Sequence, residues 1–147
     1  MRGGLYGTLT GAKMTAVSTH IRTIVVDDSP RFLRTVCSFL SQYKIVDVIA
    51  TANCGSEALL AVDSLRPDLM LMDFHMPFLN GLKTMAEIRR RFPATRIVIV
   101  TGYDSPELRQ ASLESGALAF IPKLYVSREL PHLLAKIAAS LDAEAAL

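Results

Sequence analysis

The chain has no tryptophan, only two cysteines and almost no net charge over its 147 residues. Sixteen lysines and arginines face fourteen aspartates and glutamates, and this formal surplus of +2 gives no electrostatic footprint for nucleic acid. The cysteines, Cys37 and Cys54, have neither metal-site nor redox spacing, so we expect small buried thiols in a reducing compartment. No stretch approaches the ~18 consecutive apolar residues that a membrane-spanning helix requires.

Apolar residues, in contrast, make up 50% of the chain, and the mean hydropathy is +0.31. This composition excludes a disordered protein, and the length suits one ordinary domain. It is typical of strands that are covered on both faces, as in parallel sheets. Residues 1–20 lack the apolar core of a secretion signal, so we expect a disordered or non-native tail, with Met14 as an alternative start, and a cytoplasmic protein.

Apolar runs and amphipathic stretches alternate five times along the rest of the chain. The predicted strands are 24–26, 45–51, 68–72, 96–100 and 117–121. The predicted helices are 30–42, a segment from Asn53 or Ser56 to 66, a segment from beyond Gly81 to Phe92, 105–115, and Ser127–Leu141. Strands that alternate with helices predict a parallel sheet with right-handed crossovers and helices on both faces. Ser29 before Pro30 is a typical helix start, and Gly116 is a typical helix end.

Polar side chains stand at the carboxyl ends of four of the five predicted strands. They are Asp27, Asp28, Asp73, Thr101 and Lys123. Because binding sites of parallel sheets lie beyond the carboxyl ends of the strands, we expect these side chains to share one mouth. The second strand offers nothing polar beyond Thr51, which is consistent with a position at the sheet edge.

Three carboxylates in one mouth need compensating positive charge, because each ionised group raises the pKa of the next. Lys123 supplies one charge and a divalent cation can supply the rest. The ligands are hard oxygen atoms, which favour Mg²⁺ or Mn²⁺ over zinc. Such a site suits phosphoryl transfer, with Asp73 as the attacking carboxylate and with Lys123 and Thr101 on the phosphoryl oxygens.

Simpler interpretations exist for each residue taken alone. Asp27 and Asp28 can cap the following helix, Thr101 can be a turn residue, and Lys123 can be a surface cation. Capping does not need two acids and does not explain the convergence with Asp73, so we favour the shared site.

Three classes of enzyme are disfavoured by the residues at the predicted strand ends. A dinucleotide-binding enzyme requires a glycine-rich fingerprint where Asp27–Pro30 stands, and a P-loop requires a Gly-Lys pair that Gly81–Thr84 lacks. An aspartyl phosphatase requires a second acid two residues after its nucleophile, which the context of Asp73 does not offer.

The chain resembles the receiver domain of bacterial two-component response regulators. The resemblance lies in the acidic pair of IVVDDSP, the acceptor of LMLMDFHMPFLNG, the hydroxyl of IVIVTGYD and the lysine of AFIPK. It places a receiver domain at 21–142 and a short tail at 143–147. It implies a flavodoxin-like (βα)5 fold, a doubly wound parallel α/β sheet with strand order 2-1-3-4-5. The segment from Arg90 to Phe120 is most similar to receivers of regulators with a helix-turn-helix output domain.

The resemblance also implies a role for each site residue. Asp73 would be the phosphorylation site, and Mg²⁺ would be held by Asp28, Asp73 and the backbone carbonyl of His75, with Asp27 acting through a water molecule. Thr101 would move toward the phosphoryl group. The rotamer of Phe120 would follow, changing the surface formed by the fourth helix, fifth strand and fifth helix.

The partners implied are a sensor histidine kinase or a histidine phosphotransfer protein, and a homodimer is compatible with the family. We expect this chain itself to bind neither nucleic acid nor a membrane. Three alternatives stay open: a stand-alone receiver, the N-terminal part of a DNA-binding regulator, and a pseudo-receiver that is never phosphorylated. One departure from the family pattern is that Leu124, not proline, follows Lys123.

Overall fold

The computed structural model describes residues 19–74 and 81–147. Five parallel strands form one sheet in the order β2-β1-β3-β4-β5, which confirms the predicted fold and strand order. The strands are β1 (Ile21–Val26), β2 (Val46–Ala52), β3 (Leu69–Met72), β4 (Arg96–Thr101) and β5 (Ala119–Pro122). The helices are α2 (Pro30–Leu40), α3 (Gly55–Leu65), α4 (Gly81–Arg91), α5 (Pro106–Glu114), the 3-10 turn η1 (Lys123–Tyr125) and α6 (Val126–Ala145).

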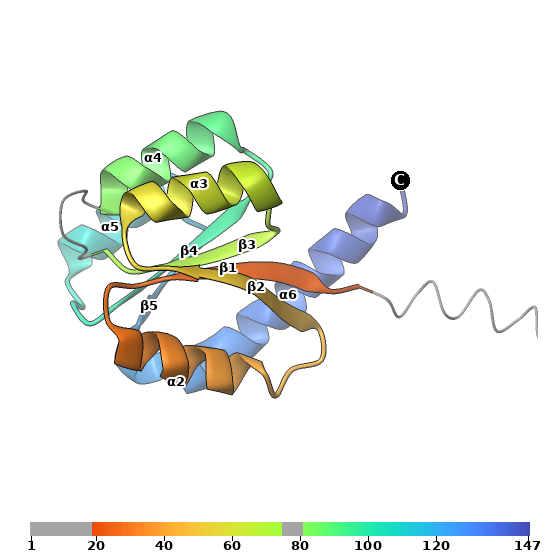
Figure 1. Ribbon diagram of the computed structural model, residues 1–147, viewed down its shortest axis with the longest axis horizontal. Helices are drawn as coiled ribbons and strands as arrows, with labels where there is room; N and C mark the ends of the chain where they lie inside the picture. Colours follow the sequence, from red (N-terminus) through yellow and green to blue (C-terminus); the bar gives the residue numbers. More distant parts are fainter. Residues whose placement is uncertain (1–18, 75–80) are drawn as a thin grey trace, which may run out of the picture.

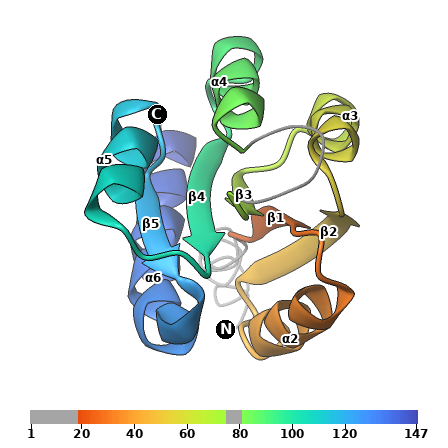
Figure 2. The same cartoon turned by 90° about the vertical axis from the view of Figure 1, so that its left-hand side faces the viewer.

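The helices cover both faces of the sheet. Helices α3 and α4 lie on one face, α2 and α6 lie on the other, and α5 lies beside the edge strand β5 (Figures 1 and 2). Side chains of the central strands alternate between the two layers, because successive residues of a strand point to opposite faces. Ile24 and Met70 are buried under α3 and α4, whereas Val25 and Leu71 are buried toward α2 and α6. The apolar composition therefore reflects a sheet that is buried on both faces.

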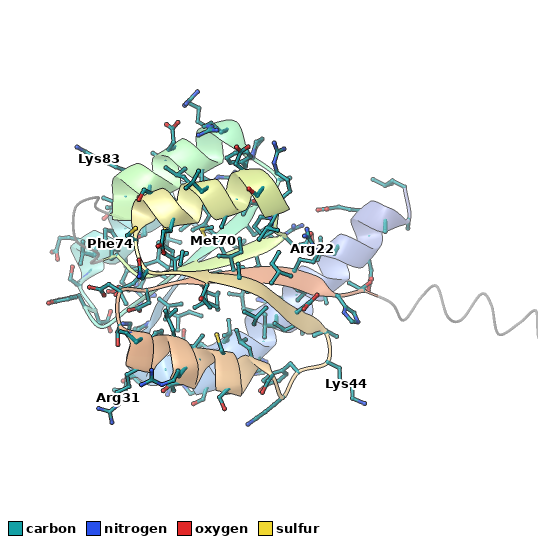
Figure 3. The ribbon with its side chains drawn as sticks, viewed as in Figure 1. Arg22, Arg31, Lys44, Met70, Phe74 and Lys83 are labelled. Atoms are coloured by element: carbon teal, nitrogen blue, oxygen red, sulfur yellow. The ribbon has the colours of Figure 1, made fainter. Side chains whose placement is uncertain are left out.

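Several charged side chains of the helices and loops lie on the outside of this three-layer arrangement. Met70 lies between the sheet and the helices above it, while Arg31, Lys44 and Lys83 point away from the core (Figure 3). None of the helices in the described ranges is both long and apolar enough to cross a membrane.

Local helix signals were partly sufficient to place the helix ends. Ser29 and Ser105 accept hydrogen bonds from the N–H groups of Phe32 and Leu108, at 3.1 and 3.0 Å, and so cap α2 and α5 as predicted. Gly116 has a φ of +108°, the left-handed conformation typical of a helix end.

Three predicted helix starts differ from the structure. Helix α4 begins at Gly81 itself, not beyond it. Helix α3 begins at Gly55 with Cys54 as its N-cap, not at Asn53 or Ser56. Helix α6 begins at Val126, directly after the turn that starts with Lys123, and not at Ser127. Asn53, Ser56 and Ser127 are good capping residues, but the ends of β2 and β5 set where the chain enters each helix.

The end of α6 also lies beyond its prediction, since the helix runs to Ala145 instead of Leu141. Leu141 is the last apolar residue of the buried stripe, and the stripe was the only signal available. The additional turn places Glu144 at 2.6 Å from the guanidinium group of Arg96 on β4. A long-range ion pair therefore accompanies the extension.

Cys37 and Cys54 are half-buried, so the prediction of buried thiols was wrong. The Cys54 thiol lies 3.3 Å from the Ser56 hydroxyl, and this contact together with the backbone N–H of Glu57 lowers the pKa of Cys54. Burial raises the pKa of Cys37 on α2.

Candidate functional site

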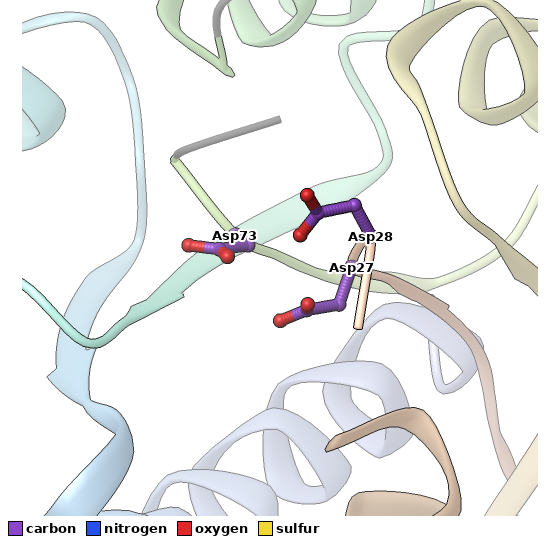
Figure 4. A group of neighbouring side chains, drawn as sticks. All are labelled: Asp27, Asp28 and Asp73. Atoms are coloured by element: carbon purple, nitrogen blue, oxygen red, sulfur yellow. The ribbon is translucent and has the colours of Figure 1, made fainter. Parts of the chain in front are cut away.

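Three carboxylates meet at the carboxyl ends of β1 and β3. These strands are neighbours in the sheet, with Val26 opposite Met72, and the N–H group of Asp73 donates to the Val26 carbonyl at 3.0 Å. Asp27 and Asp28 therefore end up beside Asp73, although more than forty residues separate them in the chain. One oxygen atom from each carboxylate lies within 4.8 Å of the others (Figure 4).

The three acids differ strongly in their exposure. Asp27 is 1% exposed and Asp73 is 6% exposed, whereas Asp28 is open to solvent. Asp27 Oδ1 accepts a hydrogen bond from the backbone N–H of Ser29 at 2.8 Å. Burial raises the pKa of Asp27 above its ordinary value, and the nearby charge of Asp73 adds to this effect.

Lys123 lies between the two buried acids. Its Nζ is 2.7 Å from Asp27 Oδ2 and donates to Asp73 Oδ2 at 3.4 Å. Burial opposes the positive charge, but the hydrogen bond to Asp27 and the charges of both acids outweigh it and raise the pKa of Lys123. The ammonium group therefore stays charged and neutralises part of the acidic cluster.

One contact of Lys123 was missing from the sequence interpretation. The ammonium nitrogen lies 4.1 Å from the ring centroid of Phe32 on α2, within the range of a cation–π interaction. The sequence indicated only that Phe32 lies on the apolar side of its helix. Phe32 lies in the first helical turn after Asp27 and Asp28, and that turn begins at the rim of the site. This position was the one signal in the sequence that could have predicted the contact.

Thr101 lies fully buried at the end of β4, the strand next to β3. Its hydroxyl accepts a hydrogen bond from the backbone N–H of Tyr103 at 3.3 Å. Across the β4–β5 pair Thr101 is opposite Pro122, the residue before Lys123. Thr101 and Lys123 thus come from adjacent strand ends.

The two other predicted residues are Phe120 and His75. Phe120 is 3% exposed on β5. The predicted ligand His75 lies outside the described residues.

The three acids are chemically suited to a divalent cation. All the side-chain ligand atoms of this cluster are carboxylate oxygens, and they are close enough together to bind one ion. Oxygen ligands of this kind fit Mg²⁺ or Mn²⁺. Together with the Lys123 ammonium group, the site holds three acids and one base. Binding of a further cation therefore remains electrostatically favourable.

Gly81, the first residue of α4, packs directly against the backbone of Asp73 and Phe74. A Cβ atom at this position would lie 2.9 Å from Phe74 Cα and 3.0 Å from the backbone oxygen atoms of Asp73 and Phe74. The Gly81 N–H donates to the Phe74 carbonyl at 3.1 Å, so the two backbones cannot separate without losing this bond.

We expect Gly81→Ala to lower the free energy of unfolding by about 1–3 kcal/mol, the usual cost of overpacking. Gly102→Ala is a matched control, because a Cβ there meets nothing within 4 Å. Urea unfolding of both variants measures the difference. Equal stability of the two variants would contradict the role of Gly81.

Residues 23–135 match the family description "Response regulator receiver domain". The chain is 36% identical, over 104 residues and 70% of its length, to a protein-glutamate methylesterase/protein-glutamine glutaminase of Geobacillus kaustophilus. The solved signal receiver domain of NarL from Mycobacterium tuberculosis has 29% identity and a TM-score of 0.76, covering 82% of this chain and 98% of that domain. The isolated receiver domain of RcsB from Salmonella enterica serovar Typhimurium, solved with the phosphomimetic BeF3⁻, has 23% identity and a TM-score of 0.75, covering 80% of this chain and 87% of that chain.

The aligned segment is 30% of the length of the Geobacillus kaustophilus enzyme, so this chain spans less than a third of it. The methylesterase activity of these homologues lies outside the segment that they share with this chain. The likeness to RcsB supports the fold alone.

Proposed function

The chain belongs to the response regulator receiver domain family, and from this premise we propose that Asp73 accepts a phosphoryl group from a phosphohistidine donor in a magnesium-dependent reaction. The observation that carries the proposal is the position of Asp73. Its carboxylate lies beside two further acids and within 3.4 Å of a lysine ammonium group, at the mouth of a parallel sheet.

In the proposed step a carboxylate oxygen of Asp73 attacks the phosphorus atom. The P–N bond of the phosphohistidine breaks, and the imidazole nitrogen leaves with the electron pair and takes up a proton. The product is a mixed anhydride of the carboxylate and phosphate. Catalysis of such a transfer depends on positioning and on charge neutralisation, because the phosphoryl oxygens carry the charge of the transition state.

Each neighbouring side chain has a proposed part in this step. Asp28, Asp73 and the backbone carbonyl of His75 would hold Mg²⁺ directly, and Asp27 would hold it through a water molecule. When bound, the divalent ion supplies positive charge to a phosphoryl oxygen. The ammonium group of Lys123 neutralises another oxygen, and its ion pair with Asp27 keeps it at the mouth. The Thr101 hydroxyl donates to a third.

Intact mass spectrometry with a small phosphodonor such as acetyl phosphate tests the proposal. We expect the protein to gain the mass of one phosphoryl group in the presence of Mg²⁺ and to remain unlabelled when the ion is chelated. A protein that stays unlabelled with Mg²⁺ present would be a pseudo-receiver, and the proposed function would be wrong.

Binding of Mg²⁺ should depend on the exposed acid of the cluster. We expect Asp28→Asn to weaken Mg²⁺ binding by at least about tenfold, since a charged ligand of a hard cation is replaced by a neutral one. Thermal unfolding with increasing Mg²⁺ measures this, because a ligand of the folded state stabilises in proportion to RT ln(1 + [L]/Kd). Asp47→Asn changes an exposed acid on β2 and serves as the control. Unchanged Mg²⁺ stabilisation in Asp28→Asn would exclude Asp28 as a ligand.

Thr101→Ala should separate phosphorylation from signal transmission. The variant retains Asp73 and Lys123, so we expect it to accept the phosphoryl group. It lacks the hydroxyl that would follow the phosphoryl group, so the change at α5, β5 and α6 should be reduced. Amide chemical shifts of these elements before and after phosphorylation measure the effect. A full wild-type response would remove Thr101 from the switch.

The proposed donor is a sensor histidine kinase or a histidine phosphotransfer protein, and the phosphoryl exchange is assigned to the cytoplasm. The effect of phosphorylation on the cell then depends on whether the receiver acts alone, pairs with a second copy or belongs to a longer regulator. Phosphorylation adds about −1.5 to −2 charge at the sheet mouth, enough to favour one of two states that differ by a few kcal/mol.

A further inference from the structure

Arg109 on α5 contacts two segments that are otherwise separate. Its Nη2 lies 3.4 Å from Asp104 Oδ1, in the loop that follows β4. Its Nη1 donates to the carbonyl oxygen of Phe120 on β5 at 3.2 Å, and its Cζ lies 4.8 Å from the centroid of the Phe120 ring. One guanidinium group therefore binds the loop after β4, the backbone of β5 and the buried ring on that strand.

Both segments lead directly to the acidic site. Asp104 comes three residues after Thr101, and Phe120 comes three residues before Lys123. Between Thr101 and Asp104 the chain passes Gly102, where a Cβ would meet nothing within 4 Å, so no neighbour crowds the loop at this residue. Only two residues separate Thr101 from Asp104, so a displacement that begins at Thr101 can continue to Asp104.

The contacts of Arg109 have a geometry that lysine cannot reproduce. A planar guanidinium group can stack on a ring and donate in its own plane at the same time, whereas an ammonium group is a point charge. The side chains of Arg109 and Asp104 are 42% and 53% exposed, and exposed ion pairs contribute little to stability. The arrangement therefore fits positioning better than stabilisation of the fold.

We propose that Arg109 is a positioning residue that couples the buried ring of Phe120 to the loop after Thr101. The inference rests on the proposed function, because the loop has to respond to a phosphoryl group on Asp73. When the loop moves, Asp104 moves relative to α5, and the guanidinium group passes this displacement to the ring and carbonyl of Phe120. Without Arg109, phosphorylation displaces Phe120 much less.

Another arginine offers a matched control. The guanidinium carbon of Arg128 lies 4.3 Å from the Tyr125 ring centroid, and its Nη2 lies 3.6 Å from Glu129. This trio has the same chemistry as Arg109, Phe120 and Asp104. All three members, however, come from one stretch of five residues, so they connect no separate segments.

The test uses the full chain labelled with fluorophenylalanine, with beryllofluoride and Mg²⁺ as the probe. Fluorine NMR reports bound beryllofluoride and the Phe120 ring in the same spectrum, and Phe120→Leu identifies the ring signal. In wild type we expect beryllofluoride to displace the Phe120 signal. In Arg109→Ala and Arg109→Lys we expect beryllofluoride to bind, while the displacement falls below half of the wild-type value. Arg128→Ala should retain the full displacement.

Asp104→Ala removes the acceptor of the loop contact without touching Phe120, so it provides the same test if Arg109→Ala does not fold; we expect the same loss. A wild-type displacement in the Arg109 or Asp104 variants would overturn the proposal. An equal loss in Arg128→Ala would also overturn the proposal. So would a Phe120 signal in wild type that does not shift when beryllofluoride binds. Neither result would contradict Asp73 as the phosphoryl acceptor. Failure of wild type to bind beryllofluoride, combined with failure to take up a phosphoryl group, would refute the proposed function and this inference together.

Discussion

Asp73→Asn is expected to abolish phosphoryl uptake from a small phosphodonor while leaving the fold intact. The amide has nearly the same shape as the carboxylate but is a far weaker nucleophile toward phosphorus. It also removes one of two buried acids around Lys123, so the variant should be at least as stable as wild type without Mg²⁺. Intact mass after treatment with acetyl phosphate and Mg²⁺ measures the uptake.

Asp104→Asn is the control for the loss of an acid outside the cluster, and we expect it to be labelled like wild type. Undiminished labelling of Asp73→Asn would mean that another residue accepts the phosphoryl group. Peptide mapping of the labelled protein would then identify that residue.

Lys123→Met is expected to have the second large effect, on both phosphoryl transfer and stability. The variant leaves Asp27 and Asp73 without the ammonium group that lies 2.7 and 3.4 Å from them. Removing one partner of a buried ion pair costs about 3 kcal/mol, and we expect a loss of this size at neutral pH. Phosphoryl uptake should slow on the order of 100-fold, since one source of transition-state neutralisation is lost.

The stability loss of Lys123→Met should depend on pH in a defined direction. Burial raises the pKa of Asp27, so this acid takes up a proton at a higher pH than a free aspartate. The penalty of the variant should therefore shrink as the pH falls from neutral toward that raised pKa. In wild type the pKa of Lys123 is raised, so its pairing persists at neutral pH and is lost only as the pH rises through that value.

Urea unfolding at neutral and at mildly acidic pH measures this dependence. Lys136→Met, an exposed lysine on α6, is the matched control and should change stability little at either pH. Asp27→Asn in the Lys123→Met background should restore much of the lost stability. A penalty that is the same at both pH values would contradict the assigned pairing.

Much of the site could be predicted because its residues stand at strand ends. The β-branched runs before Asp27 and after Arg96 identify strands, and a polar residue that follows a buried strand has to lie at the edge of the sheet. Parallel order then brings the ends of β1, β3 and β4 together. Asp27, Asp28 and Asp73 could thus be grouped from the sequence alone.

The helix starts were less predictable, because several good caps compete within a few residues. Asn53 and Ser56 both flank the start of α3, yet Cys54 is the N-cap. The position of Lys123 in a 3-10 turn, before α6 begins at Val126, had no local signal either. In each case the geometry of the preceding strand decided the point of entry.

The sequence by itself determined the class of fold, the strand order implied by the family motifs, and the acidic composition of the mouth, because periodicity and strand-end residues are local properties of the chain. Only the tertiary structure decided that Lys123 pairs most closely with Asp27, that Phe32 contacts its ammonium group, and that Arg109 joins Asp104 to Phe120. These contacts depend on side-chain directions across packed elements. No spacing along one segment encodes such directions.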